Sequence, residues 1–180
     1  DEEELMQMFQ LLTSKPVLYV ANVDEESIAE GNKFVEQLRD SIKDENASIL
    51  TVCAKIESEI AELEEQVERE EYLGMYGLTE PGVNTIIRGA YELLNLQTYF
   101  TAGVKEVRAW PITIGMKAPE AAGVIHTDFQ RGFIRAETIS FDDYVVCKGE
   151  AGAKDAGKFR VEGADYKVID GDVFHFRFNV

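Results

Sequence analysis

The chain has 180 residues, 45% of them apolar and 29% charged, which suffices for one large domain or two small ones with a true core. Neither a membrane span nor a secretory leader is expected, because no run of about 18 apolar residues occurs and the first residues are acidic. The two cysteines, Cys53 and Cys147, lie far apart and form no CxxC pair, which is typical of a cytoplasmic protein with reduced thiols and no cysteine-bound metal.

The net charge of −16 is unevenly distributed along the chain. Residues 1–97 carry 22 acidic and 7 basic side chains, whereas residues 98–180 carry 12 and 11. The first part should therefore repel nucleic acid, DNA included, while the second can present a local basic face. Two domains with different partners would produce such an asymmetry.

The first part of the chain has the pattern of an α/β fold. Short continuous apolar runs at 16–21 and 49–54 are typical of strands buried on both faces of a parallel sheet. Helical spacing of apolar residues predicts the helices 1–12, 26–43, 57–72 and one that begins at 80–84. This alternation of strand and helix favours the last part of a doubly wound sheet.

From Leu96 the pattern changes to aromatic and β-branched stretches bounded by glycine, which predict strands at 98–103, 106–115, 132–140 and 172–180. Short helices are predicted near 119–127 and 141–147, and the small polar residues 150–157 predict a loop. A compact α+β module is therefore expected after a boundary at Asn95–Gln97.

The first apolar run ends in Asn22-Val23-Asp24-Glu25, where ligands of open α/β sheets bind. Guanine-nucleotide-binding proteins have Asn-Lys-x-Asp at this place, and the Asp carboxylate accepts from N1–H and the exocyclic amine of guanine. Here Val23 replaces the Lys and Glu25 replaces the Asp, which should weaken discrimination for guanine. A peptide N–H and C=O near Val23 can instead match the edge of adenine.

The same residues have a simpler interpretation, because Asp24, Glu25 and Ser27 also suit the start of a helix. For these letters alone, capping is favoured. The second strand end decides between the two, since Cys53-Ala54-Lys55 stands where nucleotide-binding G domains have Ser-Ala-Lys, a loop whose backbone N–H groups approach the base. Two such motifs in the right order predict a base pocket.

Five stretches carry a wider resemblance: "KPVLYVANVDE", "CAKIESEIAEL", "GLTEPGVNTIIRGAYELLNLQTYFTAGVKEVRAWPI", "KAPEAAGVIHTDFQRGFIRAETI" and "DGDVFHFRFNV". Together they are similar to the YchF/Obg-like ATPase family over essentially the whole chain, and the stretch from Leu93 to Val107 is highly specific. The resemblance implies a P-loop G domain with a coiled-coil insertion, followed by a TGS domain, which is a ubiquitin-like β-grasp module. It also implies a monomer that hydrolyses ATP in preference to GTP and associates with ribosomes.

Carried onto this sequence, the resemblance assigns residues 1–96 to the C-terminal part of the G domain and residues 97–180 to the TGS domain. The residues that match the base-binding motifs are Asn22, Val23, Glu25, Cys53, Ala54 and Lys55. No GxxxxGK[ST] motif and no suitably placed Asp-x-x-Gly occur in the chain, so the phosphate contacts and the Mg²⁺ ligands for ATP are expected upstream. The chain, as the C-terminal half of a longer protein, is expected to contain no catalytic residue and to be inactive alone.

The second part of the chain offers basic residues that can form a surface for ribosomal RNA, with solvated surface charge as an equally good interpretation. These residues are Arg131, Arg135, Lys148, Lys154, Lys158 and Arg160, and Phe129 or Phe133 is available for stacking. His126 is expected to pack or cap, and His175 to point outward from a strand.

Two alternative functions remain open. The chain can be a non-enzymatic module that binds RNA, ribosomes or protein on an α/β scaffold, and it then shows no nucleotide dependence. It can also belong to a GTPase with a relaxed motif, which binds GTP at least as tightly as ATP.

Overall fold

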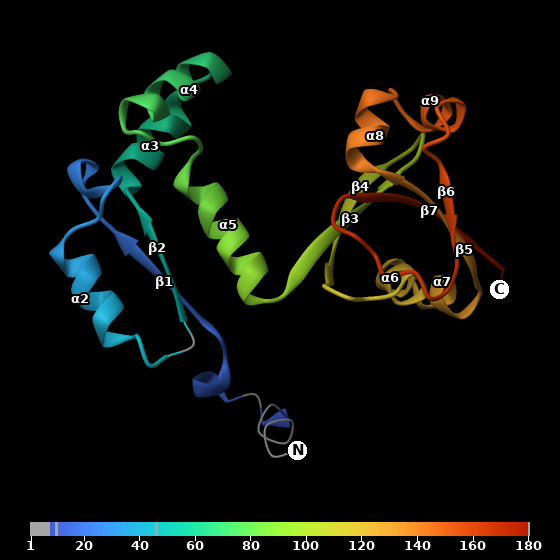
Figure 1. Ribbon diagram of the computed structural model, residues 1–180, viewed down its shortest axis with the longest axis horizontal. Coiled ribbons are helices and arrows are strands. Elements are labelled where there is room, and N and C mark those ends of the chain that lie inside the picture. Colours follow the sequence, from blue (N-terminus) through green and yellow to red (C-terminus); the bar gives the residue numbers. More distant parts are fainter. Residues whose placement is uncertain (1–7, 10, 46, 180) are drawn as a thin grey trace. The chain divides into compact units, whose positions relative to one another are not determined.

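The computed structural model describes residues 8–9, 11–45 and 47–179, and it divides into two compact units, one ending at Leu94 and one beginning at Asn95 (Figure 1). The helix predicted at 1–12 falls mainly outside the described residues. The chain that follows it forms a single 3₁₀ turn, η1 (Leu12–Ser14).

The first unit is built on two parallel strands, β1 (Val17–Asn22) and β2 (Ala47–Val52), as the apolar runs predict. The helices of this unit are α2 (Lys33–Ser41), α3 (Ala54–Glu62), α4 (Gln66–Met75) and α5 (Gly82–Leu93). Helices α2 and α5 flank the strands in Figure 1. Helix α5 lies close to β2 because Gly89 has no side chain, and a Cβ there would lie 2.7 Å from Leu50 Cδ1.

The prediction that β1 is buried on both faces is wrong for the described residues. Val17 and Val20 are 42% and 43% exposed. Within the described chain β1 pairs only with β2, so one edge of the strand and part of its surface have no cover.

The single helix predicted at 26–43 is also wrong. The chain first forms a 3₁₀ turn, η2 (Glu25–Ser27), and then reverses at Gly31, whose φ of +79° is a conformation that favours glycine. Asn32 starts α2, because its Oδ1 accepts hydrogen bonds from the N–H groups of Phe34 and Val35 at 3.0 and 3.2 Å.

The prediction of one helix at 57–72 is wrong, because two helices, α3 and α4, occupy this part of the chain and are separated at Leu63. The chain is extended at Leu63, and the guanidinium of Arg69 donates to the Leu63 carbonyl at 2.8 and 2.6 Å. That contact satisfies a carbonyl at the end of α3 and turns the chain into α4.

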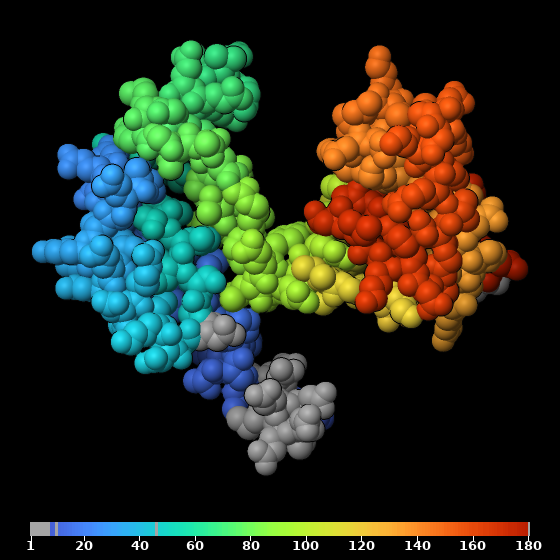
Figure 2. All heavy atoms as spheres, in the orientation of Figure 1, coloured from blue at the N-terminus to red at the C-terminus, as the bar shows by residue number. Residues whose placement is uncertain are grey.

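The second unit is a mixed five-stranded sheet in the order β4-β3-β7-β5-β6, with a short parallel pairing between β3 and β7. Its strands are β3 (Leu96–Ala102), β4 (Val107–Thr113), β5 (Phe133–Ser140), β6 (Arg160–Glu162) and β7 (Asp172–Phe178). Its helices are α6 (Ala118–Ile125), α7 (Thr127–Arg131), α8 (Phe141–Val146) and α9 (Glu150–Asp155). Side chains fill the space between these ribbons (Figure 2).

The loop predicted at 150–157 is wrong, because α9 occupies most of it. Lys154 and Glu150 form an ion pair across one helical turn, with 2.5 Å between Nζ and Oε1. Gly152 allows the helix to follow α8 closely, since a Cβ there would lie 2.0 Å from the Cys147 carbonyl oxygen.

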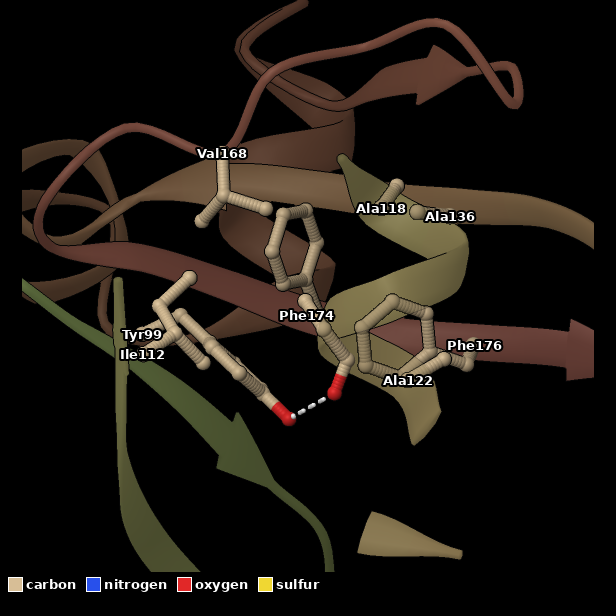
Figure 3. Packing of buried hydrophobic residues seen from close by; sticks show 9 residues of the cluster. Tyr99, Ile112, Ala118, Ala122, Ala136, Val168, Phe174 and Phe176 are labelled. Atoms are coloured by element: carbon tan, nitrogen blue, oxygen red, sulfur yellow. Dashed lines mark hydrogen bonds between the residues drawn. The ribbon is translucent and has the colours of Figure 1, made fainter. Parts of the chain in front are cut away.

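The core of the second unit is centred on Tyr99, which is fully buried against Phe174 and Phe176 (Figure 3). Its hydroxyl donates to the Ala121 carbonyl in α6 at 2.8 Å, and burial raises the pKa of this phenol. Trp110 packs partly buried against the same cluster. The bond joins sheet and helix at the point where their apolar faces meet.

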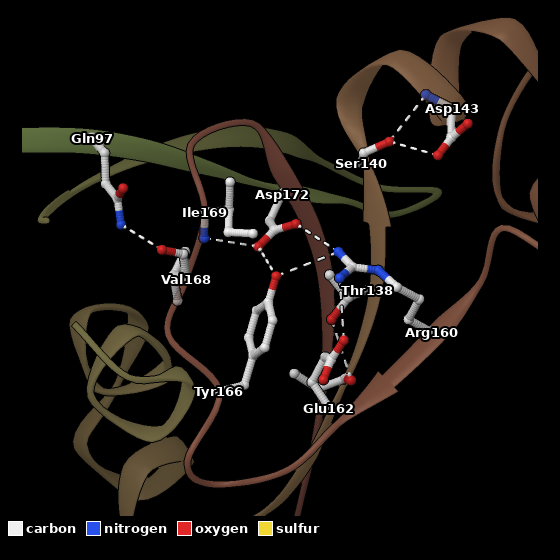
Figure 4. A network of polar contacts seen from close by, with 11 residues as sticks. Gln97, Thr138, Ser140, Asp143, Arg160, Glu162, Tyr166, Val168, Ile169 and Asp172 are labelled. Carbon is white, nitrogen blue, oxygen red and sulfur yellow. Dashed lines mark hydrogen bonds and ion pairs between the residues drawn. The ribbon is translucent and has the colours of Figure 1, made fainter. Parts of the chain in front are cut away.

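A polar network in this unit surrounds the buried carboxylate of Asp172 (Figure 4). It accepts from the Tyr166 hydroxyl at 2.8 Å, from the Ile169 N–H at 3.0 Å and from the Arg160 guanidinium at 3.1 Å. A buried carboxylate needs such partners, so these side chains serve the fold.

Tyr99→Phe should lower the free energy of unfolding by about 1–2 kcal/mol, because the Ala121 carbonyl loses a buried donor while the ring still fills the core. Denaturant unfolding of the chain would measure the loss. The matched control is Tyr144→Phe, since the Tyr144 hydroxyl has no hydrogen-bond partner within the described residues. Equal effects of the two substitutions would contradict this role of the Tyr99 hydroxyl.

Candidate functional site

The ends of β1 and β2 lie side by side at one edge of the first unit. The register pairs Asn22 with Val52, so the segments that follow the two strands leave the sheet together. This brings the two sequence motifs, Asn22–Glu25 and Cys53–Lys55, to one place although about thirty residues separate them in the chain.

Two hydrogen bonds hold these segments against each other. The Oδ1 of Asn22 accepts from the Ala54 N–H at 2.9 Å, and the Val23 N–H donates to the Val52 carbonyl at 2.8 Å. Asn22 therefore fixes the start of α3, whose cap residue Cys53 provides no side-chain hydrogen bond. The Cys53 side chain is buried beside Ile56 and does not line the surface of the site.

An ion pair joins the outer parts of the same two segments. The Lys55 ammonium contacts the Glu25 carboxylate, with side-chain exposures of 63% and 32%. The hydrogen bond to Glu25, followed by the Coulomb attraction of that carboxylate, raises the pKa of Lys55. Glu25 is thus held by a cation rather than left as a free acceptor.

The capping interpretation holds for a neighbouring residue. The carboxylate of Asp24 accepts from the Ser27 N–H at 3.0 Å and caps the short turn η2. Glu25, in contrast, points to Lys55. The side chains of Asn22 and Asp24 therefore accept hydrogen bonds from backbone N–H groups, whereas the Glu25 carboxylate contacts Lys55 at the surface of the site.

The backbone donor expected near Val23 is not the N–H of Val23 itself. The N–H of Val23 is already bonded to Val52, so this group is not available to the N1 atom of an adenine. A hydrogen bond from the backbone to the edge of a base would have to come from another peptide group of this segment.

Glu57 is a residue that the sequence motifs did not indicate. Its carboxylate accepts from the N–H groups of Gly82 at 2.6 Å and of Val83 at 3.3 Å, and so satisfies the start of α5. Because Glu57 lies on α3, this contact fixes the helix that begins at Ala54 against α5. An acidic residue one turn into a helix was the only available signal for it.

Two pockets of the described chain lie away from this edge. One of about 550 Å³ is lined by residues of α3, α4 and the start of α5, and one of about 410 Å³ by residues of the second unit. Neither includes Asn22, Glu25 or Lys55. Asn22 and Lys55 are exposed, so the candidate base site lies at the surface between two strand ends.

Most of the basic residues proposed for RNA are already paired with carboxylates. Arg135 contacts Glu137, Lys154 contacts Glu150, Lys158 contacts Asp143, and Arg160 contacts Glu162 and Asp172. Within the described part of the chain, Arg131 and Lys148 have no ion pair. Phe129 stacks on Phe178 and Phe133 packs against Phe176, so both rings serve the fold.

The two histidines take the expected structural places. The Nδ1 of His126 accepts from the Asp128 N–H at 3.1 Å and caps α7. His175 is exposed on β7. No group of three or more His, Cys, Asp or Glu side chains that could hold a metal occurs among the described residues, and none of the helices described is long and apolar enough to cross a membrane.

Two parallel strands with flanking helices, followed by an α+β unit, give a mixed α/β architecture, which confirms the fold class expected from the sequence. The family model YchF-GTPase_C, described as "Protein of unknown function (DUF933)", matches residues 96–179. Over its whole length the chain is similar to YchF proteins, which confirms the resemblance expected from the sequence.

Curated relatives and a solved structure support this assignment. The chain is 57% identical over 180 residues to "Ribosome-binding ATPase YchF" of Pasteurella multocida and 55% identical over 182 residues to that of Bacillus subtilis. Each comparison covers 100% of this chain and 49% or 50% of the relative, so the chain spans about half the length of these relatives. The YchF GTPase structure of Schizosaccharomyces pombe matches with a TM-score of 0.80 and 32% identity, over 97% of this chain and 46% of that one.

Asn22→Ala should loosen the junction between the two segments. The Ala54 N–H would lose its acceptor, which is worth about 1 kcal/mol, so its amide hydrogen exchange should become about fivefold faster. Asn22→Asp keeps an acceptor oxygen at the same place and serves as the control. Unchanged exchange of the Ala54 amide in Asn22→Ala would contradict the role of this bond.

The pairing of Glu137 predicts a pH-dependent contribution to stability. Hydrogen bonds from Arg177 hold the pKa of Glu137 below its ordinary value. Since the folded pKa lies below the unfolded value of about 4.3, this contribution is present above that pH and is lost as the pH falls through the folded pKa.

Denaturant unfolding at a series of pH values would measure it. Between about pH 5 and pH 3, the free energy of unfolding should fall more steeply for the wild type than for Glu137→Gln, which has no proton to gain at this position. Equal pH dependence in the two proteins would show that Glu137 contributes nothing.

Proposed function

We propose that this chain is the C-terminal part of a ribosome-associated P-loop nucleotide hydrolase, in which residues 1–96 provide base recognition and residues 97–180 form a TGS domain. The observation that carries the proposal is the hydrogen bond from Ala54 to Asn22, because it joins two separate motifs into one loop edge at the ends of parallel strands. The names of the relatives, which describe ribosome-binding ATPases, support it.

The base would lie against the edge formed by Asn22, Val23 and Glu25 on one side and Cys53, Ala54 and Lys55 on the other. Asn22 orients the Cys53–Lys55 segment rather than touching the base with its amide oxygen, since that oxygen already accepts from Ala54. Cys53 acts through its backbone, because its side chain is buried. Val23 lacks the long stem with which a lysine covers guanine.

ATP is the preferred nucleotide in this proposal, with GTP as the weaker one. A carboxylate selects guanine by accepting from two donors on its edge, and adenine presents a lone pair at N1 instead. Glu25 is longer than the aspartate of guanine-specific proteins and is already bound to Lys55. Both features reduce the advantage of guanine.

The chemistry of hydrolysis would come from residues outside this chain. A bound Mg²⁺ supplies charge neutralisation on the phosphates, and a P-loop supplies their backbone N–H contacts. The residues of this chain hold the base end of the nucleotide. The chain alone is therefore proposed to be unable to hydrolyse ATP.

The second unit is the proposed contact with the ribosome. Among the basic residues considered above, Arg131 and Lys148 are the better candidates for RNA phosphates, because the other four already have carboxylate partners. A module that binds ribosomes without nucleotide is the alternative, and it would show the same affinity in the presence and absence of ATP.

The double substitution Val23→Lys and Glu25→Asp restores the guanine-type motif, so it should shift the ratio of ATP to GTP affinity toward GTP by at least about tenfold. The measurement is calorimetric titration of the full-length protein containing this chain with each Mg²⁺-nucleotide at fixed salt. Glu26→Asp, a change of the same kind next to the site, is the control. An unchanged ratio would contradict base recognition by this segment, and tighter wild-type binding of GTP would favour a GTPase.

A further inference from the structure

The contact between Lys55 and Glu25 joins two segments that meet only through the folding of the sheet. Glu25 follows β1 and Lys55 follows β2, thirty positions later. Lys55 directly follows Ala54, and Glu25 lies three positions after Asn22, the two residues that this hydrogen bond joins. The pair is therefore set by the same junction that forms the candidate base site.

Glu25 is the carboxylate that engages Lys55 among the charged groups around it. Glu59 and Tyr76 also act on the Lys55 ammonium, but more weakly. Glu59 lies on the same helix as Lys55, and its carboxylate accepts from the Tyr72 hydroxyl. The Glu25 carboxylate has no hydrogen-bond donor other than Lys55 within the described residues.

This arrangement changes what the carboxylate can do. To recognise guanine, both of its oxygens would have to accept from the N1–H and the exocyclic amine, with the full negative charge facing the base. An ammonium on one oxygen removes part of that acceptor capacity and offsets the charge. Guanine therefore has to compete with Lys55 for Glu25, while adenine, whose N1 offers no proton, has no such competitor to displace.

We propose that Lys55 is a specificity-determining residue, which lowers the affinity for guanine nucleotides by holding the Glu25 carboxylate. The inference rests on the proposed function, since it presumes that a base binds at this edge. It assigns to the Lys55 side chain a role that the Cys53–Lys55 motif does not, because the motif concerns only the backbone of the segment.

Replacing Lys55 by methionine tests the inference, since methionine keeps an unbranched apolar stem without the charge. In Lys55→Met the ratio of GTP to ATP affinity should rise by about two- to fivefold, the range expected when a half-exposed ion pair no longer competes. Calorimetric titrations of the full-length protein with Mg²⁺-ATP and Mg²⁺-GTP would measure the ratio. Loss of the Lys55 charge changes the attraction of the protein for the phosphates of both nucleotides alike, so this effect cancels in the ratio.

Two controls make the result specific. Lys55→Arg keeps a cation next to Glu25 and should leave the ratio near that of the wild type. Lys43→Met removes one exposed lysine from the loop before β2 and should also leave it unchanged. In Glu25→Gln the effect of removing Lys55 should disappear, because no carboxylate is left to release.

The outcomes separate this inference from the proposal on which it rests. Wild-type binding of ATP together with an unchanged ratio in Lys55→Met overturns the role of Lys55 alone. An equal rise in Lys55→Arg and Lys55→Met also overturns it, since the ion pair is then not the cause. Failure of the wild-type protein to bind either nucleotide overturns both the base site and this inference.

Discussion

The hydrogen bond from the Ala54 N–H to the Asn22 side chain is the constraint on which the candidate site depends. It closes a loop of more than thirty residues, and a single bond of this kind contributes only about 1 kcal/mol net. Its effect is large because the parallel pairing of β1 and β2 has already brought the two strand ends together. The bond then decides how the segments after them face each other, and the ion pair between Glu25 and Lys55 follows from that.

A second set of contacts, between α5 and the elements α3 and β2, stabilises the segment that begins at Ala54. Glu57 joins α3 to the start of α5, and Gly89 lets α5 lie close to Leu50 of β2. The start of α3 is thus held from one side by the strand end and from the other by a helix that packs on the same sheet. A site built on such fixed elements can orient a flat ligand at an exposed edge, where Asn22 and Lys55 lie.

Much of this arrangement could be predicted from the sequence, because local patterns carry it. Continuous apolar runs indicated β1 and β2, and their order indicated parallel pairing. The prediction of one long helix at 26–43 was wrong because the apolar spacing continues across Gly31 and Asn32. The positive φ of Gly31 and the capping by Asn32 start a new helix there. The prediction of a loop at 150–157 was wrong because small polar residues do not exclude a helix. Helix α9 forms there, supported by the ion pair between Lys154 and Glu150 and by the missing side chain of Gly152.

The side-chain partnerships could not be predicted in the same way. The contacts of Glu25 with Lys55 and of Glu57 with Gly82 join residues 25 to 30 positions apart, and they depend on strand register and helix packing. The pairing of four proposed RNA-binding residues with carboxylates is of the same kind. A linear pattern shows which charges are present but not which of them remain free.

The most direct test of a base site at this edge is a crystal structure of the full-length protein with Mg²⁺ and a non-hydrolysable ATP analogue. The account predicts that the adenine ring lies between the Asn22–Glu25 and Cys53–Lys55 segments, with Asn22 still bonded to the Ala54 N–H. An adenine bound away from both segments would contradict it.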